Sequence, residues 1–288
     1  MSRTIATHGK ESQEVGNKIL VSVFDSEKNA FEGLTALKDL HHEGDVTLYA
    51  STVIAKDASG TVAVRQAADN GPIGTLAGVV TGGLVGLLGG PVGVAVGAYV
   101  GGLGGLMYDL FNVGIGADFI DEVSASLTPG KAALVADLDE TWVTPIDTRL
   151  GSLGGTTFRR LPGEIVDAEL IRETDAARAE LEQLRAEVRE TTGEAKANVE
   201  GAIQAQQRKL VALDDRIGKA LDQQQAEFDA RLTTLREQQA KARESQRQRI
   251  NARMDELKAS HEARKVKLAE ARRLAKASIE ATREALVS

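Results

Sequence analysis

The stretch "KILVSVFDSEKNAFEGLTALKDLHHEG", residues 18–44, decides the fold. Its first part, "KILVSVFD", is a short run rich in β-branched residues, which predicts a buried strand. The remainder keeps apolar residues at helical spacing, starts with the polar pair Ser26 and Glu27, and ends at Gly44, a residue type that terminates helices. The stretch therefore predicts a strand followed directly by an α-helix.

The sequence on the C-terminal side of this unit continues the alternation of strands and helices. The runs "DVTLYASTVIAKD" and "GTVAVRQA" flank residues 57–60 and predict a β-hairpin. A helix is expected over 118–130, then a buried strand in "KAALVADLDETW", and then a helical turn with a last edge strand in "VTPIDTRLGSLGGTTFRR". The fold class predicted is α+β, with a ferredoxin-like βαββαβ head.

Composition divides the 288-residue chain near residues 159–167. Beyond Gly163 there is no proline, and Ala, Glu, Gln, Arg, Lys and Leu dominate, which is typical of long helices. The polar N-terminus lacks the apolar core of a secretory signal. We therefore expect a disordered lead over 1–17, a head domain over 18–162 and a long helix or coiled coil over 163–288.

Charge and cysteine content exclude several functions. The tail from residue 164 carries 24 basic and 24 acidic residues, which leaves the head 11 of the 35 basic and 18 of the 42 acidic residues. An acidic head argues against nucleic-acid binding and against simple electrostatic docking to anionic lipid. The chain has no cysteine, so thiol catalysis, disulfides and thiolate metal sites are excluded, and a reducing cytoplasm fits.

The segment between the predicted hairpin and the second helix is apolar and rich in glycine. No charged residue lies between Asp69 and Asp109, and Pro91 divides the segment into two arms of about 19 and 18 residues. Spacing of four places glycines on one helical face, where another backbone can approach closely. We therefore predict a glycine-zipper helical hairpin over 71–108. Its helix-association residues are Gly74, Gly78, Gly82, Gly86, Gly90, Gly93, Gly97, Gly101 and Gly105.

Two environments for this hairpin stay open. A phosphate-binding loop is disfavoured because no Lys or Arg lies between Arg65 and Lys131. Arms of roughly 27 Å fall slightly short of the ~30 Å bilayer core, and neither end carries a cationic anchor. The hairpin therefore either contacts membrane lipid or is buried in the core of a homo-oligomer. Glycine weakens an isolated helix, so in both cases it needs an associated partner.

Four blocks in this order resemble a known family. They are "ILVSVFDSEKNAFEGLTALKDL", the glycine insert "AADNGPIGTLAGVVTGGLVGLLGGPVGVAVGA", "FIDEVSASLTPGKAALVADLDE" and "GGTTFRRLPGE". Over roughly 18–170 the chain resembles DUF1269, bacterial proteins of unknown function with a glycine-zipper insert. The resemblance implies the fold and a membrane link. It supplies no activity and no catalytic residues, and the long tail extends beyond the family's core domain.

Apolar residues in the tail recur every eleven positions. The coiled-coil core predicted from this repeat consists of Val188, Val199, Leu210, Leu221, Leu232, Leu257, Leu268 and Ile279. An eleven-residue repeat gives straight or slightly right-handed supercoiling. An unbroken helix of about 125 residues would be roughly 190 Å long. The stripe is thin, and Gly193, Gly201 and Gly218 are weak points, so the helix needs a partner helix or a surface.

Charge along the tail indicates how helices would pair. Residues 164–230 carry 9 basic and 16 acidic residues, whereas 231–288 carry 15 basic and 8 acidic. Antiparallel or staggered packing would bring opposite charges together, while parallel packing in register would not. A simple solvated helix face is the alternative, and contact of the basic end with anionic lipid or nucleic acid is a third interpretation.

Candidate chemistry is sparse. His41 and His42 end the first helix, where a cationic ring suits the helix dipole, although with Glu43 they are also candidate metal ligands. In "DLDE", Asp137 and Asp139 share one strand face, expected to face solvent, and paired-carboxylate chemistry or calcium binding is disfavoured there. The lone tryptophan, Trp142, is expected to pack at the sheet edge. We expect no enzyme, cofactor, metal or small-molecule substrate, and no nucleic-acid partner.

The sequence therefore favours a non-enzymatic, self-assembling, membrane-associated scaffold. The expected partners are further copies of the chain and, through 71–108, membrane lipid. The expected location is the cytoplasmic side of the bacterial inner membrane, or the cytoplasm. The alternative is a soluble homo-oligomer or filament with the hairpins buried in its core.

Overall fold

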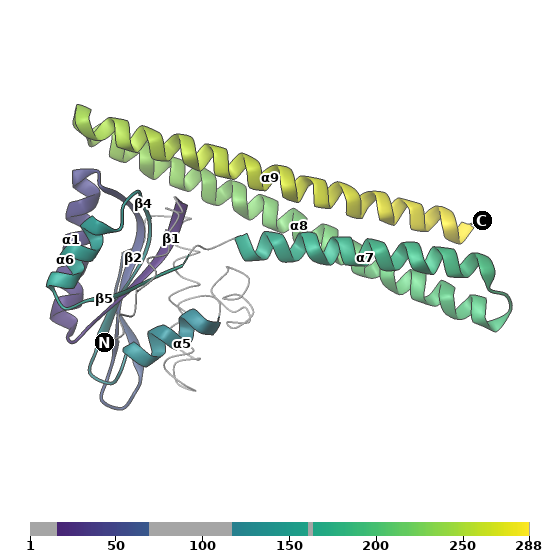
Figure 1. The fold of residues 1–288 in the computed structure, drawn as a ribbon, viewed down its shortest axis with the longest axis horizontal. Helices are drawn as coiled ribbons and strands as arrows, with labels where there is room; N and C mark the ends of the chain where they lie inside the picture. The colour runs from purple at the N-terminus through teal and green to yellow at the C-terminus, as the bar shows by residue number, and fades with distance from the viewer. Residues whose placement is uncertain (1–15, 69–116, 161–163, 288) are drawn as a thin grey trace, which may run out of the picture.

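A five-stranded antiparallel sheet with flanking helices forms the head, and three long helices form an arm (Figure 1). The structure, a computed structural model, describes residues 16–68, 117–160 and 164–287. The lead before residue 16 and the predicted hairpin 71–108, with its nine glycines, lie outside the described residues. The elements of the head are β1 Gly16–Phe24, α1 Glu27–Glu43, β2 Val46–Lys56, β3 Val62–Ala68, α5 Ala117–Ser126, β4 Ala132–Glu140, α6 Thr144–Ser152 and β5 Thr156–Arg160.

The strand order is β3-β2-β4-β1-β5, with every neighbouring pair antiparallel. The predicted β2–β3 hairpin is confirmed: the Asp57 carboxylate accepts hydrogen bonds from the backbone N–H groups of Ser59 and Thr61 in its turn. An α+β head is thus confirmed, but a ferredoxin-like order is not. The first two strands are separated, as in a split βαβ arrangement, by β4, whereas β3 lies at one edge of the sheet and β5 at the other.

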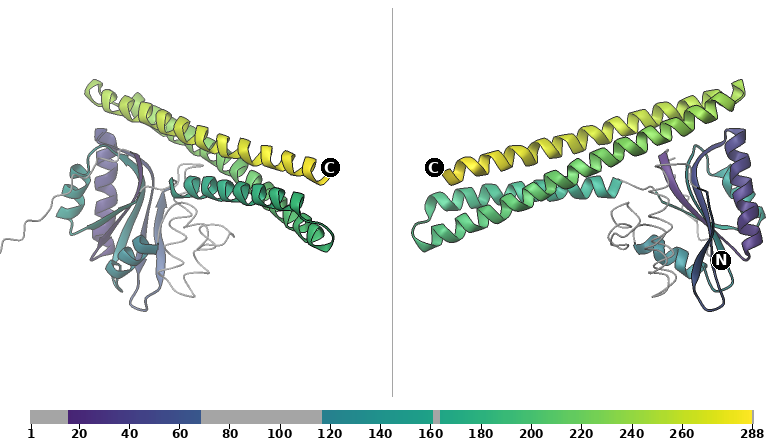
Figure 2. Two further views of the ribbon diagram at one scale, coloured as in Figure 1. Left: turned by 45° about the vertical axis from the view of Figure 1, so that its right-hand side comes forward. Right: turned by 180° about the vertical axis from the view of Figure 1, so that it is seen from behind.

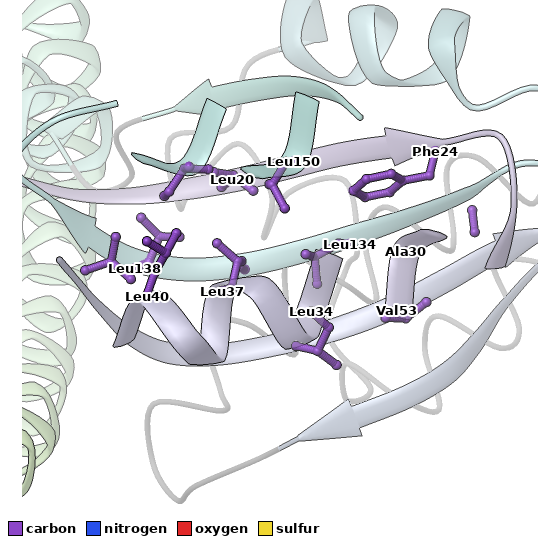
Figure 3. Close-up of a cluster of buried hydrophobic side chains, with 14 of the residues drawn as sticks. Leu20, Phe24, Ala30, Leu34, Leu37, Leu40, Val53, Leu134, Leu138 and Leu150 are labelled. Atoms are coloured by element: carbon purple, nitrogen blue, oxygen red, sulfur yellow. The ribbon is translucent and has the colours of Figure 1, made fainter. Parts of the chain in front are cut away.

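One face of the sheet is covered by α1 and α6 (Figure 3). Helix α1 starts where the Ser26 side chain accepts a hydrogen bond from the Asn29 backbone, and it ends at Gly44, which has a left-handed φ of 76°. Between these caps, apolar residues at helical spacing pack against Leu20, Phe24 and the central strand β4. The stretch that predicted the strand–helix unit therefore builds this half of the core.

The opposite face is covered in two parts. Helix α5 packs Phe119 and Val123 against Ile19 and Val135, in an apolar cluster at one end of the sheet. Along β4, side chains alternate between faces, so Asp137 and Asp139 continue the row of Val135 beyond this cluster. That part of the face contacts helix α8. Strand β4 is consequently buried on both faces along its entire length.

The tail forms three helices that reverse direction twice (Figures 1 and 2). They are α7 Glu164–Glu190, α8 Glu194–Lys241 and α9 Glu244–Val287. Long C-terminal helices are confirmed, but one unbroken helix does not form. The chain turns at Gly193, whose φ is 66°, and again at Ala242, which is extended with φ −78° and ψ 147°. The partner helix that the thin apolar stripe requires is supplied by the same chain.

Ion pairs join the three helices. Arg264 of α9 binds Asp167 of α7 at 2.6 Å, Arg272 of α9 binds Asp214 of α8 at 2.9 Å, and Arg216 of α8 binds Glu173 of α7 at 2.6 Å. In the first two of these pairs, the basic half of the tail meets the acidic half within one bundle. The pattern that suggested packing between chains is used inside the chain.

Candidate functional site

The described head contains a buried polar cluster where α8 crosses β2 and β4. Arg231 of α8 donates to the Asp137 carboxylate at 3.0 Å and lies over the Tyr49 ring, 4.7 Å from its centroid. The Tyr49 hydroxyl donates to Asp139. All four side chains are at least nine-tenths buried. The two aspartates therefore share one face, as predicted, but the expectation that they face solvent is wrong, because α8 covers them.

Burial shifts the ionisation of this cluster. Removal from water raises the pKa of Asp137 to about 6, against the opposing charge of Arg231, and it also raises the pKa of Asp139. Burial and the Asp139 carboxylate raise the pKa of the Tyr49 hydroxyl well above its ordinary value. Asp137 Oδ1 and Arg231 Nη1 are buried without a hydrogen-bond partner. The cluster thus combines one good ion pair with incompletely satisfied polar atoms.

A second set of contacts holds the turn between α1 and β2. Gln238 of α8 accepts from the Thr47 hydroxyl at 2.7 Å and donates to the carbonyls of His41 and Val46 at 2.6 and 2.8 Å. Arg253 of α9 donates to the carbonyls of Gly44 and Asp45. Side chains of α8 and α9 therefore bind carbonyl groups from the last turn of α1 to the start of β2.

Two further α9 residues reach the same turn. Arg249 donates to the Glu43 carbonyl at 3.2 Å and pairs with the Asp45 carboxylate at 3.1 Å, while Gln246 donates to the Glu43 carbonyl at 2.9 Å. Cations at the C-terminus of a helix complement its dipole. The apolar part of this contact is a small cluster of Tyr49, Leu235 and Ile250. The junction between head and arm is therefore held largely by polar contacts.

His41 does not take the role expected of it. Its ring Nδ1 accepts a hydrogen bond from the Leu48 backbone N–H, which requires an unprotonated nitrogen. Burial, followed by the charges of His42, Arg253 and Lys241, lowers the pKa of His41 to about 4. The ring is neutral near pH 7, so the predicted cationic interaction with the helix dipole is wrong. The arginines of α9 supply that charge instead.

The sequence contains one signal for this junction. Gln224, Arg231 and Gln238 are spaced by seven on α8, and all three are buried. A polar stripe at helical spacing beside an apolar one indicates a helix with two different buried faces. None of the three belongs to the core predicted from the eleven-residue repeat. Arg231 and Gln238 face the sheet and the turn between α1 and β2.

The other sequence-predicted residues are distributed along the arm. Val199, Leu210, Leu232 and Leu268 are buried, and Val188, Leu221, Leu257 and Ile279 are partly buried. Most of the eight line the apolar clusters of the arm. Trp142 is 53 % exposed where β4 passes into α6, so it is not packed at the sheet edge as expected.

The described residues hold no group of three or more His, Asp or Glu side chains placed to bind a metal ion. The carboxylates of the buried cluster are already engaged by Arg231 and Tyr49. On the opposite face, the buried Glu140 binds Arg159 at 2.6 Å and Lys18 at 3.4 Å. In both arrangements the neighbouring cations neutralise the charge of the buried carboxylates and hold their side chains in place.

Fold and junction together define an α+β protein whose antiparallel helical arm docks on its own sheet. The family model described as "Protein of unknown function (DUF1269)" matches residues 75–180, which confirms the family resemblance seen in the sequence. The match runs from the glycine-rich segment through the head into α7, and it does not include the opening strand–helix unit. Neither the curated proteins nor the solved structures contain a match.

Proposed function

We propose that the protein is a non-enzymatic scaffold that self-assembles at a membrane through the glycine-rich segment 71–108. The observation that carries the proposal is the absence of charge between Asp69 and Asp109, combined with glycine at every fourth position on both sides of Pro91. Helices with such a stripe associate by close backbone contact. The segment is placed in the connection from β3 to α5.

The rest of the chain supports this assignment by what it leaves exposed. The arm pairs its apolar stripe and its opposite charges internally. In the described residues, the exposed large apolar side chains are Trp142, Val143, Val211 and Val266. They come from the β4–α6 connection and from two separate helices. These scattered side chains form no single apolar surface in the described residues, so the proposal rests on the segment 71–108.

A soluble homo-oligomer with the segments buried in its core is the second candidate. The flanking residues Asp69, Asn70 and Asp109 favour it, because membrane hairpins usually carry cationic or aromatic anchors at their ends. Among the residues that the structure describes, none of the helices has the length and hydropathy needed to cross a bilayer. In the membrane proposal, lipid contact is therefore made by 71–108, on the cytoplasmic side of the bacterial inner membrane.

Glycine substitution tests the association that both candidates share. Gly82→Leu with Gly97→Leu should reduce the oligomer measured by light scattering after size exclusion, because a leucine on the glycine face separates the backbones. Val80→Leu with Ala95→Leu is the matched control, since these positions lie about 200° around a helix from the glycines. An oligomer of unchanged size in the glycine variant would overturn the proposal.

A further inference from the structure

The second reversal of the arm has no turn residues. Ala242 and Arg243 alone connect α8 to α9, and both are residue types with high helix propensity. Ala242 is extended there, with ψ at 147°. The first reversal differs, because Gly193 occupies a backbone conformation that side chains rarely adopt. The sequence thus encodes the first turn, whereas at the second it favours continuation of the helix.

One row of the eleven-residue repeat runs through this connection without a change of register. Its members are Leu213, Gln224, Leu235, Gln246, Leu257, Leu268 and Ile279. Eleven residues make about three helical turns, so on a continuous helix the row lies along one face. A hairpin does not need this continuity, because its turn can align the apolar faces of the two helices whatever the spacing of those residues in the sequence. A straight helix pairing along its whole length does need it.

The contacts between α8 and α9 are arranged almost symmetrically about the connection. Phe228 stacks on His261 with ring centroids 4.0 Å apart, and Asp214 binds Arg272. Asp214 precedes Ala242 by 28 residues and Arg272 follows it by 30, whereas for the ring pair the separations are 14 and 19. If the connection straightens, every such contact can form between two chains around a two-fold axis.

We propose that two copies of the chain exchange α9. In this dimer, α8 and α9 of each copy form one continuous helix, and α9 packs against α7 and α8 of the second copy. The second copy's Gln246, Arg249 and Arg253 then hold the α1–β2 turn. Short connections between exchangeable elements favour such swapping. The proposal is independent of the association through 71–108.

Engineered disulfides distinguish the two connectivities, because the chain has no native cysteine. We would refold Phe228→Cys with His261→Cys over a range of protein concentrations, oxidise it, and run a denaturing gel without reductant. Exchange links two chains, and the covalent dimer should increase with concentration. A disulfide within single chains at every concentration would overturn the proposal. Asp214→Cys with Arg272→Cys reports the same connectivity if loss of the ring stack impairs folding.

A glycine insertion tests whether a straight helical connection between α8 and α9 causes the exchange. Two glycines between Ala242 and Arg243 should lower the association constant of the dimer by roughly two orders of magnitude. In the dimer both chains would carry these glycines inside a helix, where glycine is unfavourable. The same insertion beside Gly193 is the control and should leave the constant unchanged. A covalent dimer insensitive to the first insertion would also overturn the proposal. Association through 71–108 leaves the engineered disulfide within one chain, so failure of either proposal is recognised separately.

Discussion

At the residue scale, Arg231 and Asp137 determine how firmly the arm is held on the sheet. Their side chains are 6 % and 0 % exposed, so each charge depends on the other. Replacing one member of a buried ion pair leaves an uncompensated charge, whereas replacing both by apolar groups is often neutral. The pair is therefore sensitive to single changes and tolerant of a matched double change.

We expect Arg231→Met to lower the free energy of unfolding by about 3 kcal/mol, and Arg231→Met with Asp137→Leu to lower it by much less. Urea unfolding followed by circular dichroism measures both. Arg273→Met is the control, because its ion pair with Glu270 is more than half exposed and should contribute under ~1 kcal/mol. Equal losses in the single and the double variant would contradict a coupled pair.

Two buried groups give opposite dependences of stability on pH. The pKa of Asp137 is raised to about 6, so its contribution to stability is complete below its ordinary pKa and is lost as pH rises through 6. The pKa of His41 is lowered to about 4, so its contribution is present above its ordinary pKa and is lost as pH falls toward 4. Over pH 4 to 6 the two contributions change in opposite directions and partly cancel.

Single variants should reveal each contribution. When the pH is lowered from 7 to 5, the free energy of unfolding of the unmodified protein, relative to that of Asp137→Asn, should increase by about 1 kcal/mol. Relative to His41→Asn, its stability should decrease over the same interval. Unfolding free energies of the three proteins at both pH values provide the measurement. Parallel changes in all three would show that neither group titrates as its burial requires.

At the element scale, the sequence predicts local structure better than the order of strands. Strand β1, helix α1 with its stop at Gly44, and the β2–β3 hairpin follow from periodicity and turn residues. Strand order depends on which edges meet, and no local pattern records that β4 pairs with both β1 and β2. Alternation places Asp137 and Asp139 on one face but does not say that a helix about 90 residues away covers them.

The two reversals of the arm also differ in how well the sequence predicts them. Gly193 is visible in the sequence as a weak point, and the chain turns there. The second turn lies at Ala242, within a polar stretch that contains neither glycine nor proline. Only tertiary contacts, those of Gln246, Arg249 and Arg253 with the α1–β2 turn, identify it.

Alanine substitution of two glycines tests the reversal at Gly193. Neither Gly193 nor Gly201 has an atom within 4 Å of an added Cβ, so crowding plays no part. Gly193→Ala should cost about 1–3 kcal/mol, because φ 66° with ψ −140° is a backbone conformation that alanine rarely adopts. Gly201→Ala, inside α8, should instead stabilise the protein by up to ~1 kcal/mol. Thermal unfolding compares them, and shifts of the same sign would contradict the assignment of Gly193 as the turn.

At the scale of the whole molecule, the arm packs its apolar stripe internally and covers the part of the sheet that α5 leaves open. The segment 71–108 remains as uncharged sequence with a glycine at every fourth position. In the proposed function, the described head and arm carry this segment, and the segment brings copies together at a membrane. The family match, which begins at residue 75, includes most of that segment.

The location and size of the full-length protein test this claim most directly. Bacterial cells producing it would be fractionated, and the protein sized by light scattering with and without detergent. We predict recovery with the membrane fraction and an oligomer released only by detergent. A protein that stays in solution without detergent would contradict the membrane claim: as a large complex it would support the soluble homo-oligomer, and as a monomer it would contradict self-assembly as well.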